Sequence, residues 1–600
     1  MRSFTGISAF EGMGRSSRNA CIAIAGICCL ILAMTGVAHA APHAQASRTT
    51  VLASGAERTT YKVGPIHVDP GQNRIKYAPV PGTARPSVDG YITRIKPNLV
   101  RADGSVPKSS KIMFHHGVWI NTSRMDPTSH SKGERFYATG EEKTMMQLPP
   151  GYGYPYKVSD GWLLNHMLHN LTPETMDLYI IYTIDFIPAT APEAASIKPV
   201  RPIWMDVQNG SIYPVFDVHR GEGGKDGKFT YPRDAKYDPY PVGPDNPEGI
   251  QKNEWTVDRD GILIGTTGHV HTGGLSTDLY LKRPGAKYAG PVCRKPSNSS
   301  KKALRRVRKC KSKMPSVKGD TAHLFKSTAH YFEPAGPVSW DMAMISTRPN
   351  WRVAVKAGDV LDLQTTYETK LASWYESMGI NVLYMADPGT SKADDPFKTK
   401  VDGKGIINHG HYAENNDHGG KKPLVGPDPT KLPNGIASGG PFDIGDFTYA
   451  AGDFRLPGEA GRPPTVLKGQ SFTFQLSSGD LTNHIYHSLT SCKSPCNKST
   501  GIAYPIADGK FQFDSGQLGP VNDGPPTVGR TDWTTPANLS VGTHTFFCRI
   551  HPLMRGAIRV IDPKSPKKRA AFKKAEAKQA AIFNSVAELS GSGTRVAPPS

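Results

Sequence analysis

Three residues near the end of the chain carry the side chains of a soft metal site. Cys548, His551 and Met554 follow one another at intervals of three residues in the segment FFCRIHPLMRG. A thiolate, an imidazole and a thioether, joined by a second imidazole, suit a copper ion that cycles between two oxidation states. The segment LTNHIYHSLTS offers His484 and His487 as the second imidazole. We therefore predict a type 1 copper site.

This segment resembles the ligand loop of the cupredoxins, the group of plastocyanin and amicyanin, over about residues 441–562. The resemblance implies a Greek-key β-sandwich in which His487, within YHSLTS, is the first ligand and Met554 the axial one. His484 is the alternative first ligand. Multicopper oxidases that reduce dioxygen to water have a histidine on each side of the ligand cysteine, and Cys548 has none. A laccase is therefore disfavoured.

Two histidine pairs lie further upstream. His269 and His271, in ILIGTTGHVHTGG, are two residues apart, so on a strand both imidazoles point to one face and can share a metal. This spacing alone is a weak signal. His115 and His116, in KIMFHHGVWIN, are adjacent and would point to opposite faces of a regular strand. They can share a metal only if the strand is twisted or carries a β-bulge.

The order of these motifs resembles the copper type II, ascorbate-dependent monooxygenases, which include peptidylglycine α-hydroxylating and dopamine β-monooxygenases. The motifs are FHHGVWI, LNHMLHNLTP, GHVHTGG and a Met in Glu-Ser-Met, and the resemblance runs over about residues 59–387. It implies one copper that transfers electrons and a second that reacts with dioxygen. The ligands implied for the first are His115, His116 and His169, with His166 as the alternative to His169. The ligands implied for the second are His269, His271 and Met378.

Two positions depart from the peptide-amidating members of that group. Those members hold the substrate carboxylate with an Arg two residues before H-x-H and a Tyr four residues after the Met. Thr267 and Val382 stand at these positions here, and Gly379 replaces the Cys that follows the Met. A glycine-extended peptide is therefore not the substrate that we expect.

The resemblance implies a secreted copper monooxygenase that hydroxylates a substrate C–H bond with dioxygen. It would carry about three copper ions per chain and take electrons from ascorbate or an unknown donor. The cupredoxin-like segment is a tethered one-electron carrier in this hypothesis, and the substrate is unknown. The alternative is a copper-binding or electron-transfer protein of the cell envelope that performs no oxygenation. A third, weaker hypothesis is an adhesion protein that acts through its basic segments.

The 600 residues, with 51 Pro and 61 Gly, favour several turn-rich β domains. We predict an all-β chain of two tandem antiparallel β-sandwich (jelly-roll) domains followed by the cupredoxin sandwich. The predicted segments are a signal peptide (1–40), a mobile leader (41–58), the two sandwiches (59–210 and 211–390), a Gly/Pro/His-rich linker (391–440), the cupredoxin domain (441–562) and a basic tail (563–600). Pro566 to Phe583 is expected to form an exposed helix. In the linker, His409, His411 and His418 are interpreted as solvated rather than metal-binding.

Two features of the sequence indicate export: the N-terminal segment and the number of cysteines beyond it. Basic residues, an apolar run and Ala38-His39-Ala40 are typical of a secretory signal peptide, with an uncleaved membrane anchor as the alternative. Five of the eight cysteines lie beyond it. If Cys548 binds copper, the others form two local disulfides, Cys293–Cys310 and Cys492–Cys496, as expected in an oxidising compartment.

The net charge of +20 is concentrated in two segments. Residues 294–313 hold ten Lys or Arg and no acid, in what we expect to be a loop closed by a disulfide. Residues 564–578 hold seven basic residues and one Glu. A nucleic-acid-binding protein is expected to place basic residues with aromatics on a folded face, whereas these segments lie in an expected loop and tail, so binding to nucleic acid is not expected. Solvated charge is the first interpretation, and contact with an anionic cell envelope the second.

Overall fold

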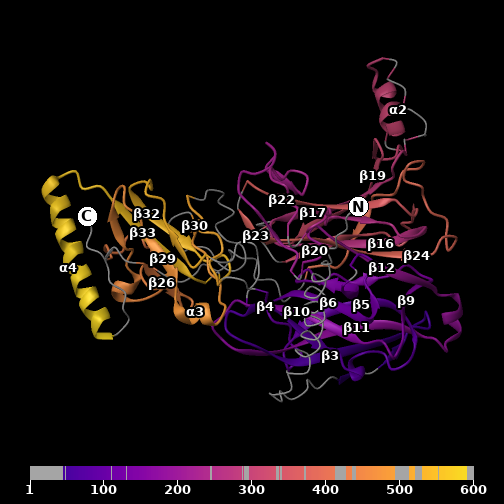
Figure 1. The fold of residues 1–600 in the computed structure, drawn as a ribbon, viewed down its shortest axis with the longest axis horizontal. Helices are drawn as coiled ribbons and strands as arrows, with labels where there is room; N and C mark the ends of the chain where they lie inside the picture. The colour runs from indigo at the N-terminus through magenta and orange to yellow at the C-terminus, as the bar shows by residue number, and fades with distance from the viewer. Residues whose placement is uncertain are drawn as a thin grey trace, which may run out of the picture. The chain divides into compact units, whose positions relative to one another are not determined.

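The computed structural model describes residues 45–590, apart from 47–48, 110, 130, 212, 244–245, 287–297 other than 288, 293 and 296, 312, 333–336, 338–340, 371–372, 412–426, 436–440, 493–511, 521–529 and 552. Strands dominate the described chain, so the predicted all-β fold is confirmed (Figure 1). Residues 44–600 form one compact unit. The predicted signal peptide lies outside the described residues.

The N-terminal strands form two layers around one apolar core (Figure 1, indigo to purple). One layer is built around β11 (Met176–Pro188), which pairs with β3 (Glu57–Val68) and β5 (Gly90–Val100). The other layer has the order β4-β10-β6-β7. Its strands are β4 (Asn73–Pro79), β10 (Trp162–Asn170), β6 (Ile112–Met125) and β7 (Gly133–Thr139). β10 and β11 are the two strands expected on either side of Thr172-Pro173. The edge strands are β1 (Gln45–Ala46), β2 (Thr50–Val51) and β8 (Met146–Gln147), whereas β9 (Tyr152–Tyr156) pairs with β5 and with β12 (Lys198–Asp206).

A second pair of layers follows in the chain. β24 (Gly379–Ala386) lies between β12 (Lys198–Asp206) and β16 (Gly261–Val270). β22 (Val360–Glu368) and β17 (Gly274–Lys282) form the centre of the facing layer. Leu263, Leu279 and Leu363 are fully buried in the core between them. The remaining strands are β13 (Phe216–Val218), β14 (Lys228–Tyr231), β15 (Glu254–Thr256), β18 (Val317–Lys318), β19 (Thr321–Tyr331), β20 (Met342–Thr347), β21 (Val353–Val355) and β23 (Trp374–Ser377).

The C-terminal strands form two four-stranded sheets around a third core, which contains Phe474, Phe546 and Ile558. One sheet is β27-β26-β29-β31, with β27 (Thr448–Tyr449), β26 (Phe442–Gly445), β29 (Thr473–Leu476) and β31 (Asp532–Thr534). The other is β28-β33-β32-β30, with β28 (Thr465–Leu467), β33 (Arg555–Ile561), β32 (Gly542–Phe547) and β30 (Thr490–Cys492). The tandem division, the jelly-roll topology and the Greek-key connection stay predictions.

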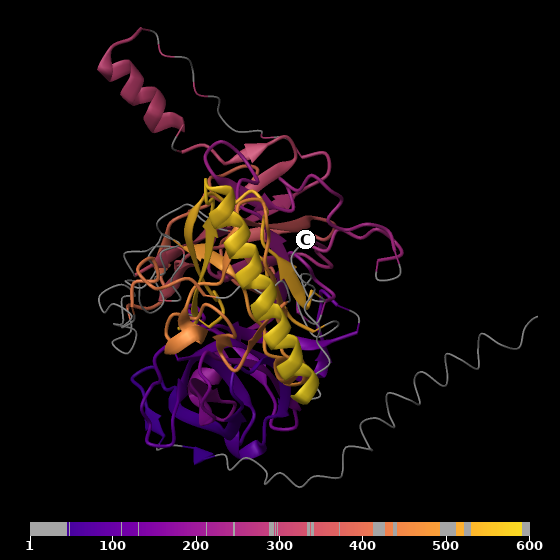
Figure 2. The same ribbon diagram turned by 90° about the vertical axis from the view of Figure 1, so that its left-hand side faces the viewer.

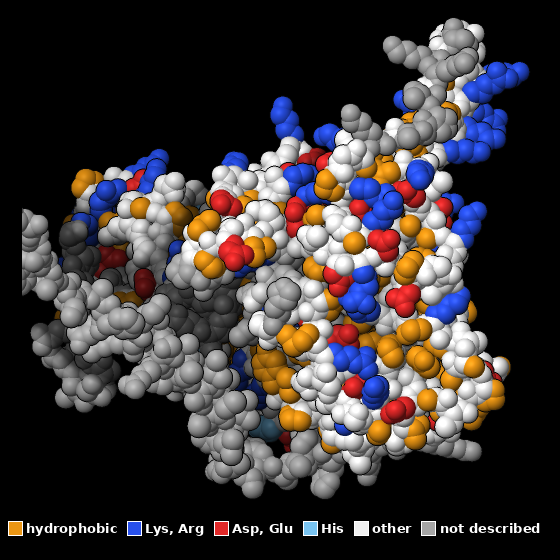
Figure 3. Space-filling view, turned by 45° about the vertical axis from the view of Figure 1, so that its right-hand side comes forward, with side chains coloured by type: hydrophobic (Ala, Val, Ile, Leu, Met, Phe, Trp, Pro, Cys, Tyr) orange, Lys and Arg blue, Asp and Glu red, His pale blue; other side chains and the backbone are white. Residues whose placement is uncertain are grey.

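Two segments differ from the sequence-based expectation. The basic segment expected to be a loop contains a helix, α2 (Lys301–Lys311), which has no buried residue and projects from the sheets with its Lys and Arg side chains exposed (Figures 2 and 3). The predicted linker contains β25 (Gly405–Ile407), which pairs with β20. A run of Lys and Arg suits an exposed helix because straight-chain side chains lose little rotamer freedom there, and Gly-rich composition does not prevent a short edge strand.

The remaining expectations about helices and cysteines are confirmed in part. α4 (Pro566–Ser590) is the expected tail helix, and it lies beside the C-terminal strands (Figures 1 and 2). Cys293 and Cys310 form a disulfide, and Cys492 is disulfide-bonded. Cys496, its expected partner, lies outside the described residues. Within the described ranges, no helix combines the length and apolar character needed to cross a membrane.

Candidate metal centres

A β-bulge in β6 places two adjacent histidines on one face of the sheet. Met167 of β10 pairs with His116, whereas the next residue, Leu168, pairs with Phe114, so His115 is an extra residue in its strand. Phe114 is fully buried in the N-terminal core. The extra residue turns His115 and His116 together away from that core, and their rings stack with centroids 4.5 Å apart.

The register of β10 decides between the two candidates for the third ligand. His166 has the same parity as Leu164 and Leu168, whose side chains belong to the core. His169 has the opposite parity and faces the paired histidines, with its ring centroid 6.0 Å from that of His115. The structure therefore brings His169 to the cluster and leaves His166 among core residues.

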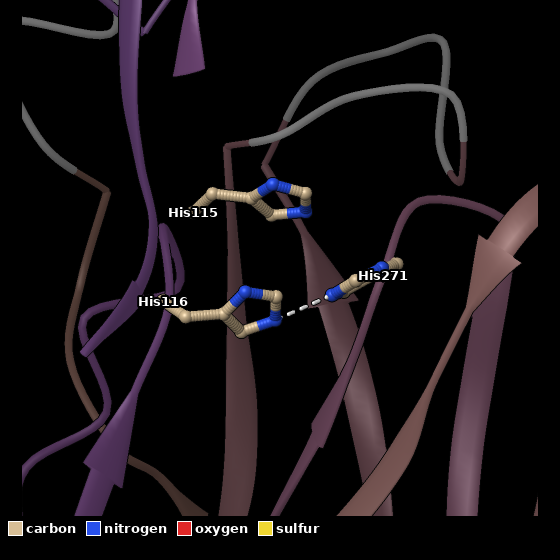
Figure 4. Close-up of side chains that lie close together, drawn as sticks. All are labelled: His115, His116 and His271. Carbon is tan, nitrogen blue, oxygen red and sulfur yellow. Dashed lines mark hydrogen bonds between the residues drawn. The ribbon is translucent and has the colours of Figure 1, made fainter. Parts of the chain in front are cut away.

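The H-x-H pair approaches from the second set of strands. His269 is the second-last residue of β16, and His271 directly follows that strand. The centroids of their rings are 5.2 Å apart. The Nε2 atoms of His116 and His271 lie 2.9 Å apart (Figure 4). His115, His116 and His271 form a group whose ligand atoms all lie within 4.8 Å. Two sets of ligands that were expected to form separate sites thus meet in one cluster of five histidines.

Hydrogen bonds to Nδ1 orient three of these rings. His115 Nδ1 lies 3.3 Å from the side-chain oxygen of Asn73, and His269 Nδ1 lies 2.9 Å from a carboxylate oxygen of Glu142. His271 Nδ1 is hydrogen-bonded to the backbone carbonyl of Glu376. An acceptor at Nδ1 holds the proton there, which leaves the lone pair on Nε2 available for a metal.

One buried hydroxyl connects the H-x-H segment to the predicted Met ligand. The Tyr367 hydroxyl accepts hydrogen bonds from the backbone N–H groups of His271 (3.1 Å) and Met378 (2.8 Å). It donates to the Met378 carbonyl at 2.8 Å. Met378 itself is buried and packs with Trp204 and Ile380. Its side chain and His116 line the same cavity.

Burial keeps the clustered imidazoles neutral. Desolvation, followed by the proximity of the other histidines, lowers the pKa values of His115, His116 and His271 well below the ordinary value. Burial alone lowers the pKa of His169 to about 3. A neutral imidazole is the form that binds a metal ion. The cluster therefore holds its ligand atoms ready at neutral pH.

The second candidate centre lies in the C-terminal sheets. Cys548 Sγ is 3.8 Å from His487 Nδ1 and 3.9 Å from His551 Nδ1, and the two nitrogens are 3.2 Å apart. These three residues form the second group with ligand atoms within 4.8 Å. Met554 is fully buried in the same core as Cys548. The structure brings His487 to this group, whereas His484 belongs to a turn with φ +56°.

Hydrogen bonds also fix the second centre. His487 Nε2 is 2.8 Å from the Asp480 carboxylate, which leaves Nδ1 for the metal. The backbone N–H groups of Ser488 and His551 donate to Cys548 Sγ, each at 3.3 Å. Burial opposes ionisation, but these contacts and His487 outweigh it and lower the pKa of the Cys548 thiol. Against burial, Asp480 and Cys548 raise the pKa of His487 to about 9.

The two centres are in direct contact. The rings of His169 and His551 meet edge to face with centroids 6.1 Å apart. Gln517 Nε2 donates to the Glu376 carboxylate at 2.7 Å, and the carbonyl of that Glu376 orients His271. Burial raises the pKa of Glu376, and the hydrogen bonds from Gln517 and Tyr213 oppose this rise. The guanidinium of Arg549 lies 4.7 Å from the Tyr375 ring centroid.

The linker histidines are not solvated as a group. His409 is hydrogen-bonded to the backbone carbonyl of Glu142, whose side chain supports His269. His411 Nδ1 lies 2.5 Å from the buried carboxylate of Asp341. His418 lies outside the described residues. The interpretation as solvated was wrong for His409, which is partly buried because β25 leads it back onto the second set of strands, whereas His411 is exposed.

The supporting residues were not predicted from the sequence. Glu142, Glu376, Tyr367 and Asp480 act on ligands that are 7 to 127 residues away in the chain. Asp480 is the one supporting residue with a local sequence signal. It lies in the short helix that Ser477 caps, seven residues before His487. The other contacts depend on strand register between distant segments, which the spacing of residue types does not contain.

The side chains of both groups can hold a metal ion. The Nε2 atoms of His169 and His269 are buried with no hydrogen-bond partner among the described residues. A buried unpaired nitrogen is rare, and a metal ion would satisfy it. The thiolate, two imidazoles and thioether of the second centre are a soft set that favours copper over harder ions. Both groups can therefore hold metal ions, and copper is the ion that the second donor set favours.

Comparison with known proteins adds no assignment. No family model matches the chain, and no curated protein is similar to it.

Proposed function

We propose that this chain is an extracytoplasmic copper-dependent monooxygenase with a built-in electron donor. The reaction is R–H + O₂ + 2e⁻ + 2H⁺ → R–OH + H₂O. The observation that carries the proposal is the contact between His551 of the cysteine-containing centre and His169 of the five-histidine cluster. It joins a centre suited to one-electron transfer with a cluster that has a cavity beside it.

A row of imidazole rings connects the two centres. His487 and His551 have ring centroids 4.9 Å apart, and His169 follows at 6.1 Å. His115 continues the row at 6.0 Å, and His271 is 4.7 Å beyond it. Bound copper would supply the one-electron oxidation and reduction steps at both ends. The protein fixes the position of each ring and buries all five of them, so water is kept out of the path between the centres.

We keep the division of ligands that the resemblance implies, with His116 and His271 as the two ligands that approach each other across the cluster. His115, His116 and His169 would hold the copper that passes electrons on, and His269, His271 and Met378 the copper at which dioxygen is reduced. A thioether ligand favours the reduced ion. Glu142 and the Glu376 carbonyl hold His269 and His271 in the tautomer that binds metal. Tyr367 fixes the backbone of Met378 relative to His271.

The alternative is an electron-transfer protein without oxygenase activity. Oxygen consumption by the full chain, loaded with copper and supplied with ascorbate, separates the two functions. We expect oxygen uptake in a one-to-one ratio with a hydroxylated product in a screen of C–H substrates. Reversible reduction and oxidation of copper with no oxygen uptake would contradict the monooxygenase.

A pair of methionine variants makes the test specific. Met378→Leu keeps the volume of a buried side chain but removes the thioether, so we expect oxygen uptake to be lost while the blue colour of the cysteine-containing centre stays. Met385→Leu is the matched control, because Met385 is buried in β24, the strand that begins directly after Met378, and packs in the core of the second set of strands. Equal loss in both variants would contradict the role of Met378.

The location of the protein is part of the proposal. The Cys293–Cys310 disulfide is the kind of bond that persists in oxidising compartments. The exposed basic helix α2 presents Lys and Arg side chains that suit an anionic cell envelope. Both features favour secretion.

A further inference from the structure

A cavity of about 310 Å³ opens beside the five-histidine cluster. It lies over the face of the β4-β10-β6 sheet that is turned away from the N-terminal core. His116 and Met378 line it, and so does Tyr213, whose hydroxyl donates to Glu376 at 2.8 Å. The volume is at the lower end of the range of roughly 300–1,000 Å³ found for small-molecule sites.

The walls of the cavity are mostly apolar, with Asn165 and Thr122 among the uncharged polar residues that line it. Val118 and Ile120 of β6, Leu163 of β10 and Ile75 of β4 all line it, and each is only partly buried. They alternate along their strands with residues of the N-terminal core, such as Trp119. An alternating strand normally presents polar residues to water on its outer face. Aliphatic residues on this face are therefore suited to an apolar molecule.

The two cations that line the cavity are already engaged. Arg135 Nε donates to Asp126 at 2.7 Å, and its guanidinium stacks over the Trp204 ring at 4.5 Å. Lys132 Nζ donates to the backbone carbonyl of Ser211 at 2.7 Å. An anionic substrate would have to break these contacts to gain a partner. The described lining contains no carboxylate that could hold a cationic substrate.

The positions that anchor a peptide carboxylate in the resembling enzymes do not reach this cavity. Thr267 and Val382 instead line a separate cavity of about 30 Å³ next to His269. That volume holds one or a few water molecules. Of these two cavities beside the described histidines, the larger one has room for a substrate.

We infer that the cavity binds a neutral, mostly apolar small molecule and presents one of its C–H bonds to the histidine cluster. The inference rests on the proposed function for the reaction and on the lining for the class of molecule. Val118 and Ile120 determine which molecules fit, and Met378, a ligand assigned to the oxygen-reacting copper, marks the end at which the reaction takes place.

Binding of three molecules that share one skeleton tests the charge preference. Titration calorimetry on the full copper-loaded chain would compare 2-phenylethanol, phenylacetate and phenethylamine, which are neutral, anionic and cationic. Removing a charged group from water without a partner costs several kcal/mol, so we expect the neutral molecule to bind at least about tenfold more tightly than either ion. Tighter binding of phenylacetate or phenethylamine, or binding of none of the three, would overturn the inference.

Variants that fill the cavity test its location. Val118→Phe and Ile120→Trp enlarge partly exposed side chains, and we expect each to weaken binding of 2-phenylethanol at least about tenfold. Ile66→Phe, at a partly buried position of β3 outside the cavity lining, is the matched control. Unchanged copper content and blue colour show that each variant is folded. Unchanged affinity in both filling variants would overturn the inference.

The binding experiments and the oxygen-uptake experiment can fail independently of each other. Selective binding of 2-phenylethanol without oxygen uptake would support the cavity and contradict the monooxygenase. Oxygen uptake coupled to hydroxylation of phenylacetate alone would support the monooxygenase and overturn the neutral-substrate inference.

Discussion

The rings of His169 and His551 meet edge to face with their centroids 6.1 Å apart. His169 belongs to β10 in the N-terminal strands, and His551 follows β32 in the C-terminal strands. Two candidate metal centres on separate segments of the chain are thus in contact through histidine side chains. The rest of that contact includes Arg549, which is hydrogen-bonded to the Ser373 carbonyl and lies over Tyr375.

Weakening this contact should slow electron transfer and leave both centres intact. A hydrogen bond to a charged group contributes about 1.5–3 kcal/mol. We therefore expect Arg549→Gln to lower the population of the contact, and with it the rate at which dioxygen reoxidises the blue centre, by roughly tenfold or more. Stopped-flow recovery of the blue colour during turnover measures this rate.

Arg559→Gln is the control for that experiment. Arg559 donates to the carbonyls of Leu432 and Pro429, away from Tyr375, so its loss should leave the recovery rate unchanged. If Arg549→Gln and Arg559→Gln recover equally fast, the contact does not carry electrons.

The blue colour should depend on His487 and not on His484. Cys548→Ser removes the thiolate, and His487→Ala removes a nitrogen 3.8 Å from it, so both variants should lose the intense colour and one copper ion per chain. His484→Ala should keep both. Visible absorption and copper analysis check these outcomes. A colourless His484→Ala variant would contradict the ligand set.

Tyr367→Phe should loosen the H-x-H and Met segment. The hydroxyl accepts from two buried N–H groups and donates to a carbonyl, and each group left unpaired costs about 1–3 kcal/mol. We expect a loss of a few kcal/mol in urea unfolding and faster release of copper from the five-histidine cluster to a chelator. The blue centre should keep its copper.

Tyr384→Phe is the matched control, because Tyr384 is buried and donates a single hydrogen bond to the Phe136 carbonyl. It should lose some stability but release copper at the wild-type rate. Equal copper release from both variants would show that Tyr367 has no specific role at the cluster.

The sequence was enough to identify the candidate ligand residues, but it did not predict how the strands that carry them pair and pack. Cys548 and His551 lie three residues apart in one loop, so their spacing in the sequence is enough to predict that their side chains are close together. His115 and His116 were predicted to need a twist or a bulge to share a face, and β6 has a bulge. The contact of His116 with His271 could not be predicted, since it depends on how strands 155 residues apart in the chain pack together.

His166 should make the protein less stable in acid. Burial lowers its folded-state pKa to about 4 from an unfolded value of 6.5. Between these values the unfolded chain binds more protons, so the neutral, buried form stabilises the fold fully above pH 6.5 and this contribution is lost as the pH falls towards 4. A shift of this size corresponds to about 3 kcal/mol. His166→Leu should remove the effect, because a leucine fits among Leu164 and Leu168 and does not titrate. Urea unfolding of both copper-free proteins at pH 7 and pH 4 measures it, and the other buried histidines contribute equally to each. An equal loss of stability in wild type and variant over this range would show that His166 titrates normally in the folded protein.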